Sequence, residues 1–172
     1  SKPPYLSIAN NIQKNEKQLM IYVHPYTGGS SKCLSSIDTI KICKEIEKFH
    51  PCVFMLHCDK YDYDKCKEIQ NTSNMDNMNV IRPTESLYEM CSNINQCDIF
   101  IAGSTGPLHV AGALNKKTVG LYPSKISSTS LRWKTINNDD KCLSFENSGD
   151  DSDYLKIDIN SVASIIFEKL IR

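Results

Sequence analysis

Short apolar runs alternate with amphipathic stretches along the chain, and this pattern predicts strands and helices in turn. Runs that are apolar at every position are typical of strands buried on both faces of a parallel sheet. We expect such strands at 18–23, 52–56, 80–81, 99–102 and 118–122, with an edge strand at 142–145. Apolar positions at helical spacing predict helices whose caps are Ser35 or Ser36, Thr84 or Ser86, and Asp158 or Asn160. The apolar positions of the first of these helices are Ile37, Ile40, Ile46 and Phe49. Shorter helices are expected at 65–70 and 108–114, and a loop at 71–79.

The stretch 99–123 holds the clearest unit of this pattern. Its first strand breaks at Gly103 into a polar turn, a short helix follows, and a second strand ends at Pro123. Strand, turn, helix and strand form one βαβ unit, which favours a parallel sheet. The alternation along the whole chain therefore predicts an α/β fold. We expect a doubly wound, mostly parallel sheet (Rossmann-like), which binds ligands outside the carboxyl ends of its strands.

Length and composition limit the classes of function. The 172 residues suffice for one well-cored domain, and 20 basic residues balance 20 acidic ones. A net charge of zero gives no electrostatic reason to expect a nucleic-acid partner. The eight cysteines show no CxxC pair and no metal-ligand spacing, so we expect free thiols in a reducing cytoplasm and no metal site. No apolar run approaches the ~20 residues that a membrane-spanning helix needs.

The amino terminus predicts a domain boundary. Residues 1–5 lack an initiator methionine and contain two prolines, as linkers often do. We therefore expect 1–17 to be a linker from a missing amino-terminal domain, and 18–172 to form the domain itself.

Two loops of small residues carry candidate chemistry, and the first is HPYTGGSSK at 24–32. Thr27, Gly28 and Ser30 offer hydroxyls and accessible backbone N–H groups. Lys32 adds a positive charge, and together these groups suit a phosphate or diphosphate. The spacing is neither that of a Walker A loop nor GxGxxG, so neither a P-loop nucleotidase nor a dehydrogenase is favoured. A surface turn with an incidental lysine is the alternative.

The second loop is Ser104-Thr105-Gly106, at the amino end of the helix that carries His109. Free N–H groups and the positive end of the helix dipole meet there, so an anion binds well. The five residues from Ala102 resemble the nucleophile elbow GxSxG. However, no histidine follows His109, so a serine hydrolase in the usual chain order is not expected. A structural role is the alternative for His109.

Two further features leave their alternatives open. The acidic turn with Asp59, Asp62 and Asp64 follows the second strand, where nucleotide-binding domains place a carboxylate on ribose hydroxyls. Solvated surface charge would explain the same residues. Trp133, between Arg132 and Lys134, suits either the wall of a sugar or base pocket or an anchor for a loop.

GSTGPLHVAGALNKKTVGLYP, from Gly103 to Pro123, resembles the signature of the family-nine glycosyltransferases, the bacterial heptosyltransferases of lipopolysaccharide core assembly. That signature is N-D-[TS]-G-x-x-H-x-A-A-A-L, followed by a strand that ends near Gly-Pro. HPYTGGSSKCLS is similar to the family's H-P-G-x-x-x-x-x-K-x-W, with the same spacing from His24 to Lys32. The likeness extends over 18–133. It falls on the carboxyl-terminal half of the family's two-domain GT-B architecture, the half that binds the nucleotide-sugar donor.

The resemblance implies a set of donor-binding residues and no catalytic residue in this chain. Diphosphate contacts are implied for the first loop and for the turn Thr105-Gly106, a ribose contact for Asp62, a donor-side role for Ser104, and a structural or donor-facing role for His109. The full predicted set is Thr27, Gly28, Ser30, Lys32, Asp62, Ser104, Thr105, Gly106 and His109. The family's aspartate is Ser104 here, so the donor need not be ADP-heptose. Tyr26 and Leu34 replace a glycine and a tryptophan of the family pattern.

This likeness predicts the donor-binding domain of an inverting glycosyltransferase that assembles lipopolysaccharide or another surface glycan. The family's catalytic base lies in the amino-terminal domain, so we expect the chain alone to bind donor without turning it over. No metal or cofactor is expected, because lysine and helix dipoles neutralise the diphosphate. The expected partners are a nucleotide sugar, the missing acceptor domain and a lipid-linked or oligosaccharide acceptor, in the cytoplasm or peripheral on the inner membrane. The alternative is a non-catalytic nucleotide-binding or interaction module.

Overall fold

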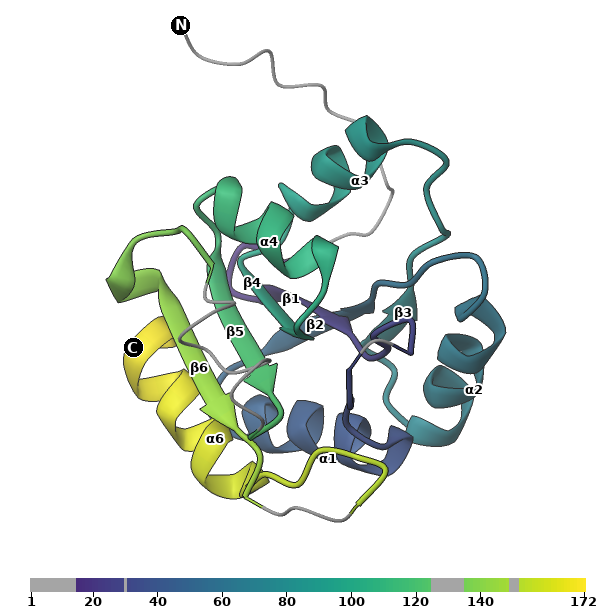
Figure 1. The fold of residues 1–172 in the computed structure, drawn as a ribbon. Coiled ribbons are helices and arrows are strands. Elements are labelled where there is room, and N and C mark those ends of the chain that lie inside the picture. Colours follow the sequence, from purple (N-terminus) through teal and green to yellow (C-terminus); the bar gives the residue numbers. More distant parts are fainter. Residues whose placement is uncertain (1–14, 30, 125–134, 149–151) are drawn as a thin grey trace, which may run out of the picture.

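The computed structural model describes residues 15–29, 31–124, 135–148 and 152–172, which form a six-stranded sheet with helices on both faces (Figure 1). The strands are β1 (Leu19–His24), β2 (Cys52–Leu56), β3 (Met78–Val80), β4 (Ile99–Gly103), β5 (Lys117–Tyr122) and β6 (Cys142–Glu146). The helices are α1 (Ser36–Glu47), α2 (Tyr63–Ser73), α3 (Leu87–Ile94), α4 (Gly106–Ala113) and α6 (Ile159–Ile166), which a π-helical turn extends over Phe167–Ile171. No helix in these ranges is long and apolar enough to cross a membrane.

The strand order is β3-β2-β1-β4-β5-β6, and every neighbouring pair is parallel. This is the order of a doubly wound Rossmann-like sheet, so the predicted fold class is confirmed, with β6 at an edge as expected. The chain winds outward from β1 in one direction to β3, then returns to the other side of β1 as β4. Strand order therefore reverses between β1 and β4. Crevices at such a reversal are where open α/β sheets bind ligands.

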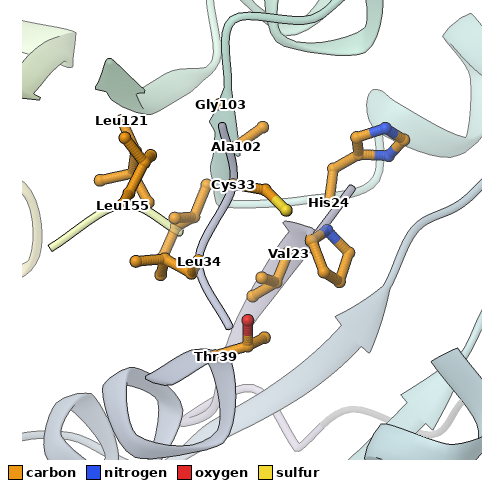
Figure 2. A pocket seen from close by; sticks show the side chains of 11 residues that line it. Val23, His24, Cys33, Leu34, Thr39, Ala102, Gly103, Leu121 and Leu155 are labelled. Carbon is orange, nitrogen blue, oxygen red and sulfur yellow. The ribbon is translucent and has the colours of Figure 1, made fainter. Parts of the chain in front are cut away.

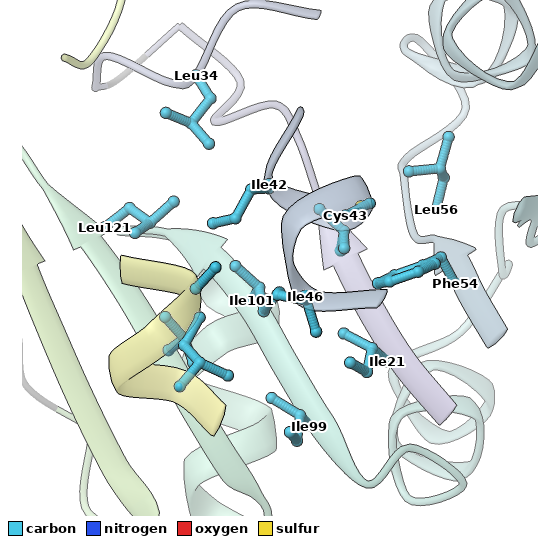
Figure 3. Close-up of a cluster of buried hydrophobic side chains, with 14 of the residues drawn as sticks. Ile21, Leu34, Ile42, Cys43, Ile46, Phe54, Leu56, Ile99, Ile101 and Leu121 are labelled. Carbon is cyan, nitrogen blue, oxygen red and sulfur yellow. The ribbon is translucent and has the colours of Figure 1, made fainter. Parts of the chain in front are cut away.

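Both faces of the sheet are covered, which is why the central strands are apolar at every position. On one face, Ile21, Phe54 and Ile101 pack under α1 and α6 (Figure 3). On the other, Tyr22 and Phe100 pack under α3 and α4.

The buried stripe of α1 differs from the predicted one. The helix buries Thr39, Ile42, Cys43 and Ile46, each of which lies three or four residues from two of the others, so all four share one face. The prediction gave Ile37 and Phe49 with Ile40 and Ile46, but Ile37 is 77% exposed because it lies off this stripe. Apolar identity alone did not show which face the sheet would cover.

Element boundaries also differ where the sequence is polar. Helix α2 runs to Ser73 instead of 70, and β3 begins at Met78 instead of 80. The helix continues because Ile69 and Ser73 are buried, and it ends where Asn74 takes a left-handed conformation with φ of 55°. Ser35, Ser86 and Asp158 are the caps used among the alternatives, since each side chain accepts a hydrogen bond from its helix.

Candidate functional site

The two predicted loops leave the same edge of the sheet, at the reversal of strand order. β1 and β4 lie side by side, with His24 opposite Ala102 in register. The loops then touch. A Cβ atom placed on Gly103 would lie 2.9 Å from Thr27 Cγ2 and 3.8 Å from the carbonyl oxygen of Lys32. The structure therefore brings Thr27 and Lys32 of the first loop next to Gly103, which precedes Ser104 of the second.

The first loop turns back on itself at two glycines. Gly28 and Gly29 have φ values of 65° and 82°, a left-handed backbone that favours glycine. Thr27 is buried, and its hydroxyl donates a hydrogen bond to the carbonyl of Ser31, which closes the turn. The Ser31 hydroxyl is also buried, without a hydrogen-bond partner among the described residues. The predicted ligand Ser30 lies outside the described residues.

Beneath this turn lies a small, mostly apolar pocket (Figure 2). Leu34, Leu121 and Leu155 lie on one side of it, with Cys33 near its centre and the His24 ring pointing away from the leucines. The Leu155 N–H donates to the Cys33 carbonyl at 2.8 Å, which ties the loop to the carboxyl-terminal part of the chain. The apolar pocket anchors the loop, and the polar groups suited to an anion lie on the loop itself.

The second loop begins α4. Thr105 caps the helix, its hydroxyl oxygen accepting from the Leu108 N–H at 3.4 Å. Pro107 has no N–H, and the Leu108 N–H is bound by the Thr105 hydroxyl. Of the first three helix residues, the exposed Gly106 therefore carries the N–H that this cap does not use. Thr105 keeps its hydroxyl proton for a further acceptor. Ser104 and His109 are both partly buried here, His109 one turn into the helix as predicted.

A pair of histidines between β1 and β2 was not predicted. His24 is the last residue of β1, and His57 directly follows β2. Their Nδ1 atoms are 2.9 Å apart. The ring of Phe100 from β4 lies 5.7 Å from His57 and 6.5 Å from His24, between ring centres. A histidine directly after each of two predicted strands was the signal that could have revealed this pair.

Burial keeps both rings neutral. It lowers the pKa of His57 to about 3, with a smaller contribution from the neighbouring His24. It also lowers the pKa of His24, although Asp59 and Asp62 act in the opposite direction. The short Nδ1–Nδ1 contact is therefore one N–H···N hydrogen bond, with the donor ring in one tautomer and the acceptor ring in the other.

A cavity of about 760 Å³ opens beside the histidines. Its walls come from the residues that follow β2 and β3, from α3 and from the first turn of α4. They include His57, Asp59, Thr84, Glu85 and Pro107. Apolar surface with a few polar side chains, at this volume, is typical of small-molecule sites.

Asp59 and Asp62 of the acidic turn have different partners. Asp59 lines the cavity, and its Oδ1 accepts hydrogen bonds from the N–H groups of Tyr61 (2.8 Å) and Asp62 (3.1 Å). Asp62 immediately precedes α2 and pairs with Lys65 at 2.9 Å. Lys65 Nζ in turn lies 5.1 Å from the centre of the Tyr26 ring in the first loop. The predicted ribose contact of Asp62 stays a prediction, and of these two aspartates it is Asp59 that lines the cavity.

Within the described ranges, no three His, Cys, Asp or Glu side chains come together as metal ligands would. All eight cysteines, each of which lies in those ranges, have free thiols. Trp133, considered either as a pocket wall or as a loop anchor, lies outside these ranges together with Arg132 and Lys134.

The sequence from 9 to 157 matches the profile of "Glycosyltransferase family 9 (heptosyltransferase)". A putative glycosyltransferase of Haemophilus influenzae is 31% identical over 156 residues, 84% of this chain and 45% of the relative. Lipooligosaccharide heptosyltransferase 2 of Campylobacter jejuni is 26% identical over 129 residues, 73% of this chain and 40% of the relative. The structure of Escherichia coli ADP-heptose lps heptosyltransferase II aligns with a TM-score of 0.73 at 17% identity, over 94% of this chain and 49% of that one. The fold is that of the carboxyl-terminal half of a GT-B glycosyltransferase.

Proposed function

Because the chain belongs to glycosyltransferase family 9, the heptosyltransferase family, we propose that it is the donor-binding half of an inverting glycosyltransferase. The product would be lipopolysaccharide or a related surface glycan. One observation carries this proposal: the loops after β1 and β4 meet where strand order reverses, beside a cavity of about 760 Å³. The chain spans about half the length of the relatives it matches. The acceptor site and catalytic base are therefore proposed for the rest of the enzyme, and this chain alone would bind donor without transferring it.

The diphosphate of the donor would lie between the two loops. Lys32, the amides around Gly28 and the buried hydroxyl of Ser31 belong to one side, and Thr105 and Gly106 to the other. The positive end of α4 favours negative charge at this place. In the transition state, charge builds up on the departing nucleoside diphosphate, so the same groups would stabilise it without a metal ion.

The nucleoside would lie in the adjoining cavity. Its carboxylates, Asp59 and Glu85, are acceptors for ribose hydroxyls, and His24 and Pro107 form the side next to the loops. We propose Asp59 as the ribose contact, because it lines the cavity while Asp62 is paired with Lys65. Asp59→Asn should then weaken binding of a nucleotide more than Asp62→Asn does.

The sugar end would lie beside Ser104, where the family pattern has aspartate. The solved Escherichia coli relative is named for ADP-heptose. A hydroxyl accepts hydrogen bonds more weakly than a carboxylate. Ser104 therefore favours a donor whose sugar needs a weaker hydrogen-bond acceptor at that position. The donor class that we propose is a nucleoside diphosphate sugar, with ADP-heptose as one candidate.

Titration calorimetry with ADP, ADP-sugars and UDP-sugars tests the proposal. The wild-type chain should bind at least one of them, and Lys32→Ala should weaken that binding about ten-fold or more, since a charge-assisted bond contributes about 1.5–3 kcal/mol. Lys48→Ala is the matched control, because Lys48 lies at the far end of α1 and pairs with Glu45. Absence of binding by the wild type, or equal affinities for Lys32→Ala and Lys48→Ala, would contradict the proposal.

We further propose a cytoplasmic enzyme that acts on a lipid-linked or oligosaccharide acceptor, either free or peripheral on the inner membrane. Eight free thiols, five of them buried, support a reducing compartment. Co-expression with an amino-terminal half from a family member would test the completed enzyme. Donor binding with no transfer in any such combination would favour the non-catalytic nucleotide-binding module instead.

A further inference from the structure

His24 lies where the two parts of the proposed donor site meet. Among the described residues, it alone lines both the small pocket beneath the first loop and the large cavity. Its ring points away from the leucines of the small pocket (Figure 2), and its backbone ends β1, where the first loop begins. A nucleotide whose nucleoside lies in the cavity and whose diphosphate lies at the loops has its α-phosphate at this junction. His24 is therefore placed next to the phosphate that carries the ribose.

The hydrogen bond to His57 sets which edge of the His24 ring a ligand can meet. The two Nδ1 atoms are 2.9 Å apart, and the ring centres are 5.1 Å apart. The second distance is about the first plus the distance of each nitrogen from its own ring centre, so the hydrogen bond lies along the line between the rings. Each Nε2 atom is then directed away from this contact. Because the side chain of Phe100, which packs against both rings, has no hydrogen-bonding group, a ligand meets His24 at its Nε2 edge.

The same hydrogen bond couples the proton positions of the two rings. A neutral imidazole carries one N–H. If the His57 Nδ1–H donates, the proton of His24 lies on Nε2, whereas if the His24 Nδ1–H donates, its Nε2 is a bare acceptor. An anion is attracted by an N–H and repelled by a lone pair, so a phosphate at this edge favours the first arrangement. Burial lowers the pKa of both histidines, so the ring that meets the phosphate is a neutral donor.

We propose that His24 donates a hydrogen bond from Nε2 to the α-phosphate of the bound nucleotide, and that His57 is a positioning residue, which keeps the proton of His24 on that nitrogen by donating to its Nδ1. This contact rests on the proposed function, which puts the nucleoside in the cavity and the diphosphate at the loops. It adds a phosphate ligand to the donor-binding set predicted from the sequence, which contains neither histidine of the pair.

Titration of the folded 172-residue chain with adenosine, AMP and ADP, and with the uridine compounds, tests the contact with the phosphate. In His24→Asn, the amide takes the place of Nδ1 and can still bond to His57, but the donor at Nε2 is lost. This variant should bind the nucleotides about ten-fold more weakly than the wild type and the nucleosides equally well, since hydrogen bonds to charged groups are the strong ones. His24→Gln, whose amide N–H reaches the place of Nε2, should recover much of the loss. His50→Asn is the matched control, because the His50 Nδ1 bonds locally to the Pro51 carbonyl at 2.9 Å, at the amino end of β2.

The tautomers of the two rings test the role of His57. Nitrogen-15 NMR of histidine distinguishes a bare ring nitrogen from an N–H. In the wild-type complex with ADP or UDP, whichever binds more tightly, we expect the proton of His24 on Nε2 and that of His57 on Nδ1. His57→Phe keeps a ring beside Phe100 but removes the donor to His24, so it should weaken nucleotide binding too. His57→Asn, whose amide N–H can replace the Nδ1–H, should restore most of that affinity.

Failure of this contact is distinguishable from failure of the proposed function. If the wild type binds no nucleotide, both are overturned. If the wild type binds ADP or UDP and Lys32→Ala weakens that binding, the proposed function stands. The phosphate contact of His24 is then overturned by a His24→Asn chain that binds nucleotides as tightly as the wild type, or that loses as much affinity for the nucleosides. A proton on the Nδ1 of His24 in the wild-type complex would overturn it as well, and this measurement does not depend on the folding of a variant.

Discussion

Replacing Gly103 by alanine tests whether the two loops depend on each other. The added Cβ would lie 2.9 Å from Thr27 Cγ2, whereas carbon atoms in contact prefer about 3.5–4.0 Å. Thr27 must therefore move by about 1 Å. Its side chain is β-branched and stiff, and rotation would break the hydrogen bond from its hydroxyl to Ser31. Overpacking of this kind costs about 1–3 kcal/mol.

The assay is a denaturant titration of the folded chain, followed by calorimetry with a donor nucleotide. Gly103→Ala should lower the free energy of unfolding by about 1–3 kcal/mol, and the melting temperature by about 2–4 °C for each kcal/mol. Nucleotide affinity should fall as well, because the first loop has shifted. Gly106→Ala is the control, since nothing lies within 4 Å of the Cβ it would add. It should change stability by less than about 0.5 kcal/mol.

A double variant gives the sharper result. Thr27→Ser keeps the hydroxyl and removes the methyl group that Gly103→Ala would meet. Combined, the two changes should therefore cost about 1 kcal/mol less than the sum of their separate costs. Strict additivity would refute the reasoning, because the strain would then arise somewhere other than at the contact between the loops.

Three further outcomes are expected. Because the pKa of His57 is lowered to about 3 in the folded chain, its unfolded form takes up a proton first, so stability should fall by up to about 1.4 kcal/mol per pH unit as pH drops from about 6.5. His57→Asn should flatten that slope in acid denaturation curves, and an unchanged slope would place the titration elsewhere. Asn137→Ala should destabilise the chain by about 2–4 kcal/mol in urea, since its buried amide donates to the Lys116 carbonyl at 2.8 Å and to the Thr118 hydroxyl at 2.9 Å. Ile42→Ala should cost about 2–5 kcal/mol, whereas the exposed Ile37→Ala should change little, and similar losses would mean that the buried stripe of α1 is misassigned.

The sequence revealed the fold because its strands are uniformly apolar and its turns are rich in glycine. These are local signals, and a parallel sheet buried on both faces is one of few arrangements that satisfy all of them. A shared edge for the two loops followed from the same logic, because loops that follow parallel strands leave the sheet at its carboxyl edge. The pairing of β1 with β4 and its register are seen only in the structure. The local signals did not show which face of α1 would be buried, because Ile37 and Ile42 are equally apolar and only packing distinguishes them.

The sequence indicated two single loops as the candidate site, and the ligand contacts of their residues stay predictions. Thr27 and Gly106 lie in loops whose small residues indicate a turn. The histidine pair was missed because its two members are 33 positions apart and meet only through the pairing of β1 with β2. Asp59 and Asp62 could not be separated either, because the hydrogen bonds of the turn decide which carboxylate faces the cavity.

The placement of β1 between β2 and β4 has a consequence for synthesis on the ribosome. The Met20 N–H is held by a carboxylate oxygen of Asp98, a residue added 78 positions later. Until β4 has been translated, the edge of β1 that pairs with it has unpaired backbone N–H and C=O groups. Another nascent strand can pair with these groups, which favours misassembly. The glycine turn after β1 is translated before its counterpart at the start of α4, which follows more than seventy residues later. A small molecule that binds both loops can therefore stabilise only chains that have already been translated past α4.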